Sequence, residues 1–257
     1  MCPVSAAASP ATAEPATTID PLLGGRVRLL QPRTGYRVAI DPVLLAAAVG
    51  ARAGEHVLDA GCGTGAAALC LAARSPEVRV VGLERDPESA ALARASVALN
   101  RLEGRVRILE GDLGRPPREL RATGFAWVMS NPPFHEPGRT EPPADGSRQR
   151  ARLESLPLER WIAACLARLA PGGRLVLIHR ADRLDAILAS LAGRAGAIDI
   201  FPLWPKPGRP AGRVLVRARK GSRAPARLLP GLVLHRADGT YTEAAESILR
   251  GAQPLPW

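Results

Sequence analysis

Short apolar runs alternate with longer amphipathic segments along most of this chain. The runs have the length of buried strands and occur at His56–Asp59, Val78–Leu83, Val106–Leu109, Phe125–Ser130 and Arg174–His179. The segments between them carry apolar residues at helical spacing, and the clearest are Ala66–Ala73, Glu88–Asn100 and Leu156–Ala170. Because strands alternate with helices in this way, the pattern predicts an α/β fold with a doubly wound, mostly parallel sheet.

The pattern is different toward the N-terminus. Residues 1–18 are rich in Ala, Pro and Thr and lack apolar periodicity, so we expect a disordered tail. Leu22–Pro32 predicts a short strand or hairpin. Asp41 and Pro42 then predict the start of a helix, with Asp41 as its N-cap and the proline at the first helical position.

The C-terminal part also changes character. Ile198–Trp204 and Val214–Ala218 predict two strands that pair antiparallel at the sheet edge, which brings the expected sheet to seven strands. Tyr241–Arg250 predicts a closing helix, with Thr240 and Glu243 at the spacing of a capping box.

These elements are expected to form a single domain over residues 19–257. Within it, residues 19–50 are a lead-in, and residues 197–257 are a basic C-terminal hairpin and helix. The polar stretch at 135–153 is long for a loop in a compact fold, and such loops are usually lids or disordered.

The charge of the chain is strongly basic, with a formal net charge of +11 and a pI of about 10.9. Arginine dominates, and the residues from Phe201 to His235 include eight basic side chains but no Asp or Glu. This imbalance predicts contacts with RNA phosphates, although a solvated face would give the same count. The candidate RNA-binding residues are Lys206, Arg209, Arg213, Arg217, Arg219, Lys220 and Arg223.

Cysteine usage and hydropathy narrow the class of protein further. The four cysteines are scattered without a C-x-x-C pair, so we expect neither a disulfide framework nor a metal site. No apolar run is long enough to cross a bilayer, and there is no basic start followed by an apolar stretch, so secretion is not expected. The expectation is a cytoplasmic protein with no membrane contact and no obligate protein partner.

A glycine-rich turn follows the first predicted strand of the alternating part, in the order Asp59-Ala-Gly61-Cys-Gly63-Thr-Gly65. Such a turn lets the backbone approach a ligand, and the helix that follows adds N–H donors. Dinucleotide sites instead use G-x-G-x-x-G. An acid before G-x-G-x-G suits S-adenosyl-L-methionine (AdoMet), which has no phosphate and carries a cationic sulfonium and an amino group.

Two further acids stand near the ends of the next strands. Glu84 ends the second predicted strand, where it could accept both ribose hydroxyls of a bound nucleoside. Asp112 follows the third, where it could accept the exocyclic amino group of adenine. Each acid also has a structural reading, since Asp59 could brace the glycine turn and Asp112 could cap a turn. Three acids at successive strand ends favour the cofactor.

Asn131-Pro132-Pro133-Phe134 ends the fourth predicted strand. The nitrogen of a planar amino group is a poor nucleophile because its lone pair is delocalised into the ring. The Asn131 side-chain oxygen and the Pro132 carbonyl could each accept one N–H and so expose the lone pair. The prolines keep the backbone extended, and Phe134 offers a face for stacking. The pattern predicts methyl transfer to an amino group.

Several longer stretches resemble class I AdoMet-dependent methyltransferases of exocyclic amino groups. They are similar above all to the bacterial tRNA(Val) adenine-N6 methyltransferases. The resemblance covers nearly all of Leu22–Gly251. It is carried by Gln-Pro-Arg-Thr-Gly-Tyr-Arg-Val-Ala-Ile-Asp-Pro at 31–42, Val-Leu-Asp-Ala-Gly-Cys-Gly-Thr-Gly at 57–65, Ser-Asn-Pro-Pro-Phe at 130–134, Gly-Arg-Val-Leu-Val-Arg at 212–217 and Gly-Leu-Val-Leu-His at 231–235.

The resemblance implies a Rossmann-like methyltransferase fold and assigns roles to single residues. The implied AdoMet-binding residues are Tyr36, Arg37, Asp41, Asp59, Gly61, Gly63, Gly65, Glu84, Arg85, Asp112, Leu113 and Asn131. The target amine is assigned to the four residues from Asn131 to Phe134. Asn-Pro-Pro-Phe-His also resembles guanine-N2 methyltransferases of ribosomal RNA. Glutamine-N5 methylation of a release factor, or an inactive RNA-binding module, are the other readings of the motifs.

Overall fold

The computed structural model describes residues 16–34, 37–121, 124–133 and 156–257. Most of the predicted tail and the loop at 135–153 lie outside these ranges, as do Tyr36 and Phe134. Thr17 and Thr18, which the composition assigned to the tail, are instead the first residues of strand β1 (Thr17–Leu22).

The described residues contain a central sheet of nine strands in the order β10, β8, β9, β7, β6, β3, β4, β5, with β11 also paired to β8. The strands are β3 (His56–Ala60), β4 (Arg79–Glu84), β5 (Val106–Glu110), β6 (Phe125–Ser130), β7 (Leu169–Arg180), β8 (Ala195–Trp204), β9 (Arg213–Lys220), β10 (Arg227–Leu228) and β11 (Leu232–Val233). Strands β3 to β7 run parallel, whereas β9 is antiparallel to both β7 and β8. The predicted α/β fold with an antiparallel pair is confirmed.

The strand count differs from the sequence expectation for a simple reason. Strands β10 and β11 are two residues long each, which is too short to leave an alternating pattern. The predicted helix ended at Ala170 and the fifth predicted strand began at Arg174, but the three residues between them, Pro171 to Gly173, belong to β7. A register shift in the pairing with β6, between Phe125 and Trp127, accommodates them.

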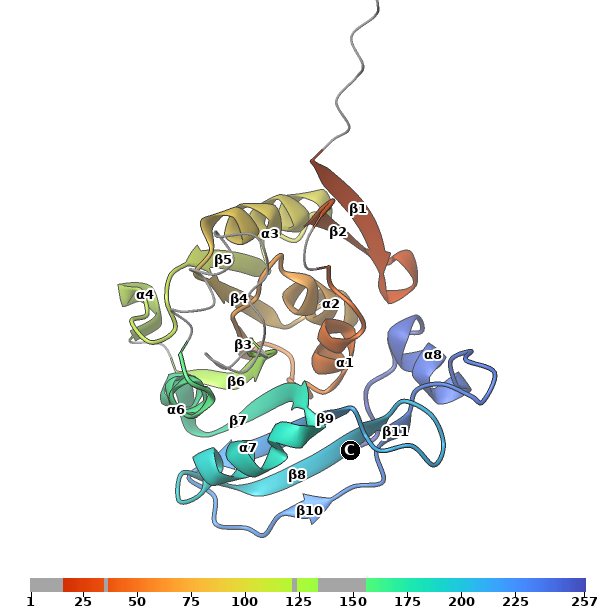
Figure 1. The fold of residues 1–257 in the computed structure, drawn as a ribbon. Helices are drawn as coiled ribbons and strands as arrows, with labels where there is room; N and C mark the ends of the chain where they lie inside the picture. The colour runs from red at the N-terminus through yellow and green to blue at the C-terminus, as the bar shows by residue number, and fades with distance from the viewer. Residues whose placement is uncertain (1–15, 35–36, 122–123, 134–155) are drawn as a thin grey trace, which may run out of the picture.

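Helices cover both faces of the sheet, as Figure 1 shows. Helices α1 (Asp41–Ala47), α2 (Ala66–Arg74), α3 (Pro87–Leu99) and α8 (Glu243–Leu249) contribute to one apolar cluster, and α4 (Arg118–Arg121), α6 (Leu158–Arg168) and α7 (Leu184–Leu191) to the other. On β6, Trp127 and Met129 point into the first cluster while Val128 points into the second. Alternate residues of one strand therefore pack into the two apolar clusters on opposite faces of the sheet.

An N-terminal hairpin packs beside this core. It consists of β1, a 3-10 turn at Leu23–Gly25 and β2 (Val27–Pro32), so the predicted hairpin is confirmed with an earlier start. Two backbone N–H groups of β2 tie it to α3: Arg28 N donates to Asn100 Oδ1 (2.9 Å) and Leu30 N to Ser96 Oγ (3.0 Å).

Two predicted helix caps are wrong. Asp41 is already inside α1, whose N-cap is Ile40, and its carboxylate instead accepts from Arg213 Nε at 3.0 Å. At α8, the cap is Thr242, whose Oγ1 accepts from Ala245 N at 3.2 Å. Thr240 belongs to the preceding turn, where its N–H donates to Asp238. Helix α7 was not predicted at all.

Candidate active site

Parallel strands place their C-terminal ends at one edge of the sheet, which we call the carboxyl edge. Asp59 lies near the end of β3, Glu84 ends β4, and Asn131 directly follows β6. Asp59 is level with Gly82 on one side and Met129 on the other. The three predicted acids and Asn131 are thus brought to one edge by topology alone.

The glycine turn has the backbone geometry that the motif implies. Gly61, Gly63 and Gly65 have φ of +74°, +55° and +90°, a backbone region that residues other than glycine rarely adopt. A Cβ at Gly61 would lie 2.9 Å from the ring of Trp161, and one at Gly65 would lie 3.3 Å from Ala93 Cβ. At Gly63, a Cβ would meet nothing within 4 Å. The middle glycine therefore presents an open face to which a ligand can come close.

Asp59 is 2 % exposed and braces the helix that follows the turn. Its Oδ2 accepts the N–H of Ala68, in the first turn of α2, at 3.1 Å. Burial raises the pKa of Asp59 to about 7, the Ala68 hydrogen bond opposes this, and the nearby charge of Glu84 adds to it. The carboxyl group is thus poised between neutral and charged forms near neutral pH.

Glu84 links the glycine turn to the start of α3. Its Oε2 accepts the Gly63 N–H and its Oε1 accepts the Asp86 N–H, both at 2.8 Å. A carboxylate has about four lone-pair directions, so these two bonds leave capacity for the two hydroxyls of a ribose.

Asp112 shapes the turn after β5. Its Oδ1 accepts from Gly114 N at 2.6 Å and from Arg115 N at 3.2 Å, which is the structural role considered for it above. Its Oδ2 faces the Arg85 guanidinium at 3.9 Å, so these two predicted cofactor residues are neighbours. Leu113 is buried among the core residues on the α6 side, so its side chain serves packing.

Trp161 joins the two motifs, a role that sequence reasoning missed. The indole ring of this α6 residue packs on Gly61, and its Nε1 donates to Ser130 Oγ at 3.0 Å. Ser130 in turn donates to the Ala60 carbonyl at 2.6 Å. The only sequence signal was a tryptophan on the apolar stripe of a helix, which more often indicates plain core packing.

Two buried polar atoms lack a hydrogen-bond partner among the described residues: Asn131 Oδ1 and Thr64 Oγ1. An unpaired buried acceptor costs about 1–3 kcal/mol, so its retention calls for an explanation. One atom lies in the glycine turn and the other at the end of β6. A cofactor bound at the glycine turn could supply the missing partner of Thr64, and a substrate amino group could supply that of Asn131. The residues present therefore fit AdoMet.

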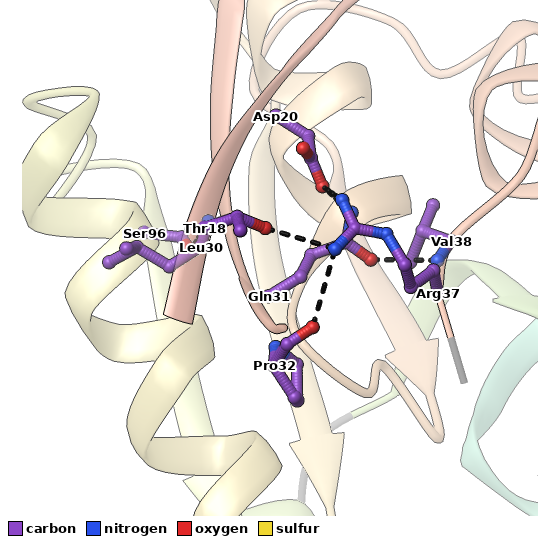
Figure 2. Close-up of polar contacts among 8 residues, drawn as sticks. All are labelled: Thr18, Asp20, Leu30, Gln31, Pro32, Arg37, Val38 and Ser96. Carbon is purple, nitrogen blue, oxygen red and sulfur yellow. Dashed lines mark hydrogen bonds and ion pairs between the residues drawn. The ribbon is translucent and has the colours of Figure 1, made fainter. Parts of the chain in front are cut away.

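The lead-in is held to the hairpin, as Figure 2 shows. Arg37 pairs with Asp20 and also donates to Thr18 Oγ1 at 3.1 Å. The buried Gln31 donates to the same Asp20 carboxylate and accepts the Val38 N–H at 2.7 Å. Arg37 was predicted to contact the cofactor, whereas the structure places its guanidinium against β1.

Asp41 and Arg213 come from the predicted cofactor and RNA sets, respectively, and they pair with each other. Their Oδ2 and Nε atoms are 3.0 Å apart. In the sheet, Arg213 is level with Arg180, the last residue of β7. The pair therefore lies at the carboxyl edge, the same edge as Asn131.

Most of the other predicted RNA-binding residues also form contacts with other residues of the chain. Arg217 donates to Asp199 at 2.7 Å and stacks 4.1 Å from the Trp257 ring centroid. Arg227 pairs with the other Asp199 oxygen at 2.7 Å. The side chains of Lys206, Arg219 and Lys220 donate to the carbonyls of Ala237, Gly172 and Leu169. Arg209 and Arg223 are exposed.

Across the described ranges, no group of His, Cys, Asp and Glu side chains has the arrangement of a metal site. Cys62, Cys70 and Cys165 are buried free thiols. The helices that the structure describes are all too short or too polar to cross a membrane.

A doubly wound sheet with a glycine turn, three acids and Asn-Pro-Pro at its carboxyl edge defines a class I AdoMet-dependent methyltransferase. The model of the methyltransferase small domain matches residues 38–193, and the chain belongs to this family. Curated relatives include the tRNA1(Val) (adenine(37)-N6)-methyltransferase of Porphyromonas gingivalis, which is 37% identical over 82% of this chain and 86% of its own length. The enzyme of the same name from Aeromonas hydrophila is 32% identical, over 82% and 87%.

Solved structures agree on the fold. A predicted O-methyltransferase from Agrobacterium tumefaciens superposes with a TM-score of 0.70 at 29% identity, over 84% of this chain and 98% of that one. An AdoMet-dependent O-methyltransferase from Thermotoga maritima has a TM-score of 0.53 at 20% identity, covering 74% and 68%, and supports the fold alone.

Proposed function

We propose that this protein transfers a methyl group from AdoMet to the N6 amino group of an adenine in tRNA, in the cytoplasm. The base and the tRNA follow from the names of the curated relatives. The structural observation that carries the chemistry is the buried Asn131 Oδ1, which lacks a partner among the described residues at the end of β6. An amino group on a flat ring supplies the donor that this oxygen needs.

The carboxyl edge provides groups for each part of the cofactor. Bound AdoMet supplies an electrophilic methyl group on a sulfonium cation. Asp59 offers negative charge beside the glycine turn, Glu84 offers acceptors for the ribose hydroxyls, and Asp112 offers one for the adenine amino group. Gly63 leaves the space in which the backbone can be approached.

The chain's own task is to prepare the nitrogen. Asn131 Oδ1 and the Pro132 carbonyl each accept one N–H, which pulls the amino group out of conjugation and exposes its lone pair. The sequence motif assigns base stacking to Phe134, two residues after Pro132, and such stacking would offset the cost of taking the base out of its stack. No general base is required, because the methylated nitrogen releases its extra proton readily.

Positioning supplies most of the acceleration in this proposal. Holding two reactants in line is worth roughly 7–11 kcal/mol in well-oriented systems. The hydrogen bonds from Trp161 to Ser130 and from Ser130 to Ala60 hold the strand end that carries Asn131 against the strand that leads into the glycine turn. The two partners of the reaction are therefore presented by one rigid unit.

Incubation with labelled AdoMet and separate tRNA, ribosome and release-factor samples tests the proposal. We expect label in tRNA, and N6-methyladenine in its nuclease digest by mass spectrometry. N2-methylguanine in ribosomal RNA, or labelled glutamine in the release factor, would replace the proposed substrate.

The variant Asn131→Ala tests the assigned role of the amide. Removing a preorganised polar group of this kind typically lowers kcat by about 100- to 1000-fold. AdoMet affinity, measured by calorimetry, should stay within about twofold, because the cofactor is held mainly by other residues. Asn100→Ala is the matched control, since the hydrogen bonds of that amide within the described residues are to the hairpin and to α3. Near-normal turnover of Asn131→Ala would contradict the assignment.

A further inference from the structure

The basic residues of strand β9 are divided between opposite edges of the sheet. Because β9 runs antiparallel to β7, Arg213 is level with Arg180 at the carboxyl edge, whereas Arg219 is level with Arg174, six residues before the end of β7. Strands advance about 3.3 Å per residue, so Arg213 and Arg219 are roughly 20 Å apart along the sheet. One basic run in the sequence thus becomes two separate surfaces.

The second surface gathers cations from several elements. We call it the amino-edge cluster, and it comprises Arg174, Arg194, Arg219, Lys220 and Arg223. Arg174 and Arg219 are paired in register, and the Arg194 carbonyl accepts the Gly221 N–H at 2.9 Å. Arg174 and Arg194 lie outside the basic run of the sequence, so only folding adds them.

A pocket of about 460 Å³ includes two cations of this cluster in its lining. It is lined by Pro171, Gly172, Arg219, Lys220, Gly221 and Ser222. Arg219 Nε donates to the Gly172 carbonyl at 3.2 Å and Lys220 Nζ to the Leu169 carbonyl at 2.7 Å. Each bond uses one donor of a group that has several, so the two cations are held in place with N–H groups to spare.

The acid of the neighbouring strand does not neutralise this cluster. Asp199 on β8 is buried, and its two oxygens pair with Arg217 and Arg227. Arg217 therefore serves the fold, whereas Arg194 and Arg223 are exposed at the amino edge. Cations spread over two strands and two turns match a chain of phosphates better than a single small anion.

We propose that the amino-edge cluster binds backbone phosphates of the substrate tRNA far from the target base. The tRNA then extends along β8 and β9 from the carboxyl edge to the amino edge. An RNA hairpin reproducing only the anticodon arm engages the catalytic edge but not this cluster. The inference rests on the proposed function and adds a second contact surface to it.

The test compares two RNAs and two double variants. Arg194→Glu/Arg223→Glu alters the cluster through exposed side chains and leaves the pocket lining intact. Arg79→Glu/Arg107→Glu is the control, with the same change in charge at exposed positions near the amino ends of β4 and β5, beyond β6 and β3. The substrates are a tRNA(Val) transcript and its isolated anticodon arm.

For the cluster variant we expect about a tenfold rise in KM for the tRNA and an unchanged kcat, with kinetics on the isolated arm unchanged. Two lost phosphate contacts should also reduce the slope of log Kd against log salt by about 1.5. The control variant should behave like the unmodified protein with both RNAs.

Equal effects on both RNAs, or equal effects of the two double variants, would overturn the inference, because either result means only general electrostatics. If the unmodified protein methylates neither RNA, the proposed function fails instead. Equilibrium binding of the two RNAs, measured by fluorescence anisotropy, still decides on the cluster in that case. An unchanged ratio of the two dissociation constants in the cluster variant would refute it.

Discussion

The carboxyl edge and strand β9 use charged side chains in contrasting ways. At the carboxyl edge, the carboxyl groups of Asp59 and Glu84 accept backbone N–H groups of α2, the glycine turn and Asp86, and they keep acceptor capacity for a ligand. On β9, the Arg217 guanidinium is neutralised by Asp199 and covered by Trp257. The acids of the first region can still bind a ligand, whereas part of the positive charge of the second region is paired within the protein.

This difference shows what a count of charges can and cannot indicate. An acid whose oxygens accept main-chain N–H groups is not paired with a cation, so its charge, once it ionises, is available to a cationic ligand. The charge of an arginine that is paired with a buried acid is not available to an anion in this way. The number of basic side chains available to RNA is therefore smaller than the number in the basic run of the sequence, and those of β9 are divided between the two edges of the sheet.

Asp199→Ala should give the largest effect, and it tests whether the charge of Arg217 on β9 stabilises the fold. It leaves the half-buried Arg217 without its partner, and removing one member of a buried ion pair costs about 3–5 kcal/mol. The free energy of unfolding, from urea denaturation, should fall by that amount while AdoMet affinity in the remaining folded protein is unchanged. A loss below about 1 kcal/mol would mean that the pair is a surface contact.

The glycine turn permits a matched comparison of Gly61→Ala with Gly63→Ala. Both alter a left-handed residue, but only the first places a Cβ 2.9 Å from the Trp161 ring. We expect Gly61→Ala to lower the free energy of unfolding by about 2–3 kcal/mol, and Gly63→Ala by about 1 kcal/mol. Both should weaken AdoMet binding, measured by calorimetry. Equal losses of stability would show that the Trp161 contact is not needed.

The pKa of Asp59 sharpens the electrostatic side of the comparison. Its pKa rises from 3.8 to about 7 in the folded protein, so folding favours the protonated form and this stabilising contribution is lost as pH rises from about 4 to 7. A cationic ligand favours the ionised form instead. AdoMet affinity should therefore increase about tenfold from pH 6 to pH 8 and level off above about pH 8.

Asp59→Asn is the control for that titration. The amide cannot ionise, so its AdoMet affinity should be weaker than that of the unmodified protein at pH 8 and should lack the step near pH 7. Isothermal titration across the pH range measures both proteins. A step of the same size in the variant would assign the titration to another group.

The smallest expected effect concerns Thr64, whose Oγ1 is buried without a partner among the described residues. Thr64→Val keeps the shape and removes the unpaired hydroxyl. The free energy of unfolding without ligand should rise by about 1 kcal/mol, while AdoMet affinity falls by a few fold. A stability gain with unchanged affinity would remove Thr64 from the cofactor site and leave its hydroxyl unexplained.

The order of strands and helices, the glycine turn and the strand-end acids were readable because each depends on local pattern. A parallel sheet then brings the C-terminal ends of β3, β4 and β6 to one edge, and this does not depend on the conformation of the loops. Asp41 and Thr240 were wrongly expected to cap helices, because they bind Arg213 and Asp238 instead. The pairing of Arg37 with Asp20 could not be predicted, because it depends on how the lead-in folds against the hairpin. The role of Trp161 could not be predicted, because a tryptophan on an apolar helical stripe gives the same sequence pattern whether its ring fills the core or packs against the glycine turn.

By itself, the sequence determined the fold class, and it identified the glycine turn, the strand-end acids and Asn131 as the candidate site. These follow from hydrophobic period and from residue types at fixed short spacing, which folding does not change. Only the tertiary structure decided which arginines remain available to a polyanion. Long side chains find acids and carbonyls from distant segments, and the antiparallel path of β9 carries one basic run to two opposite edges of the sheet.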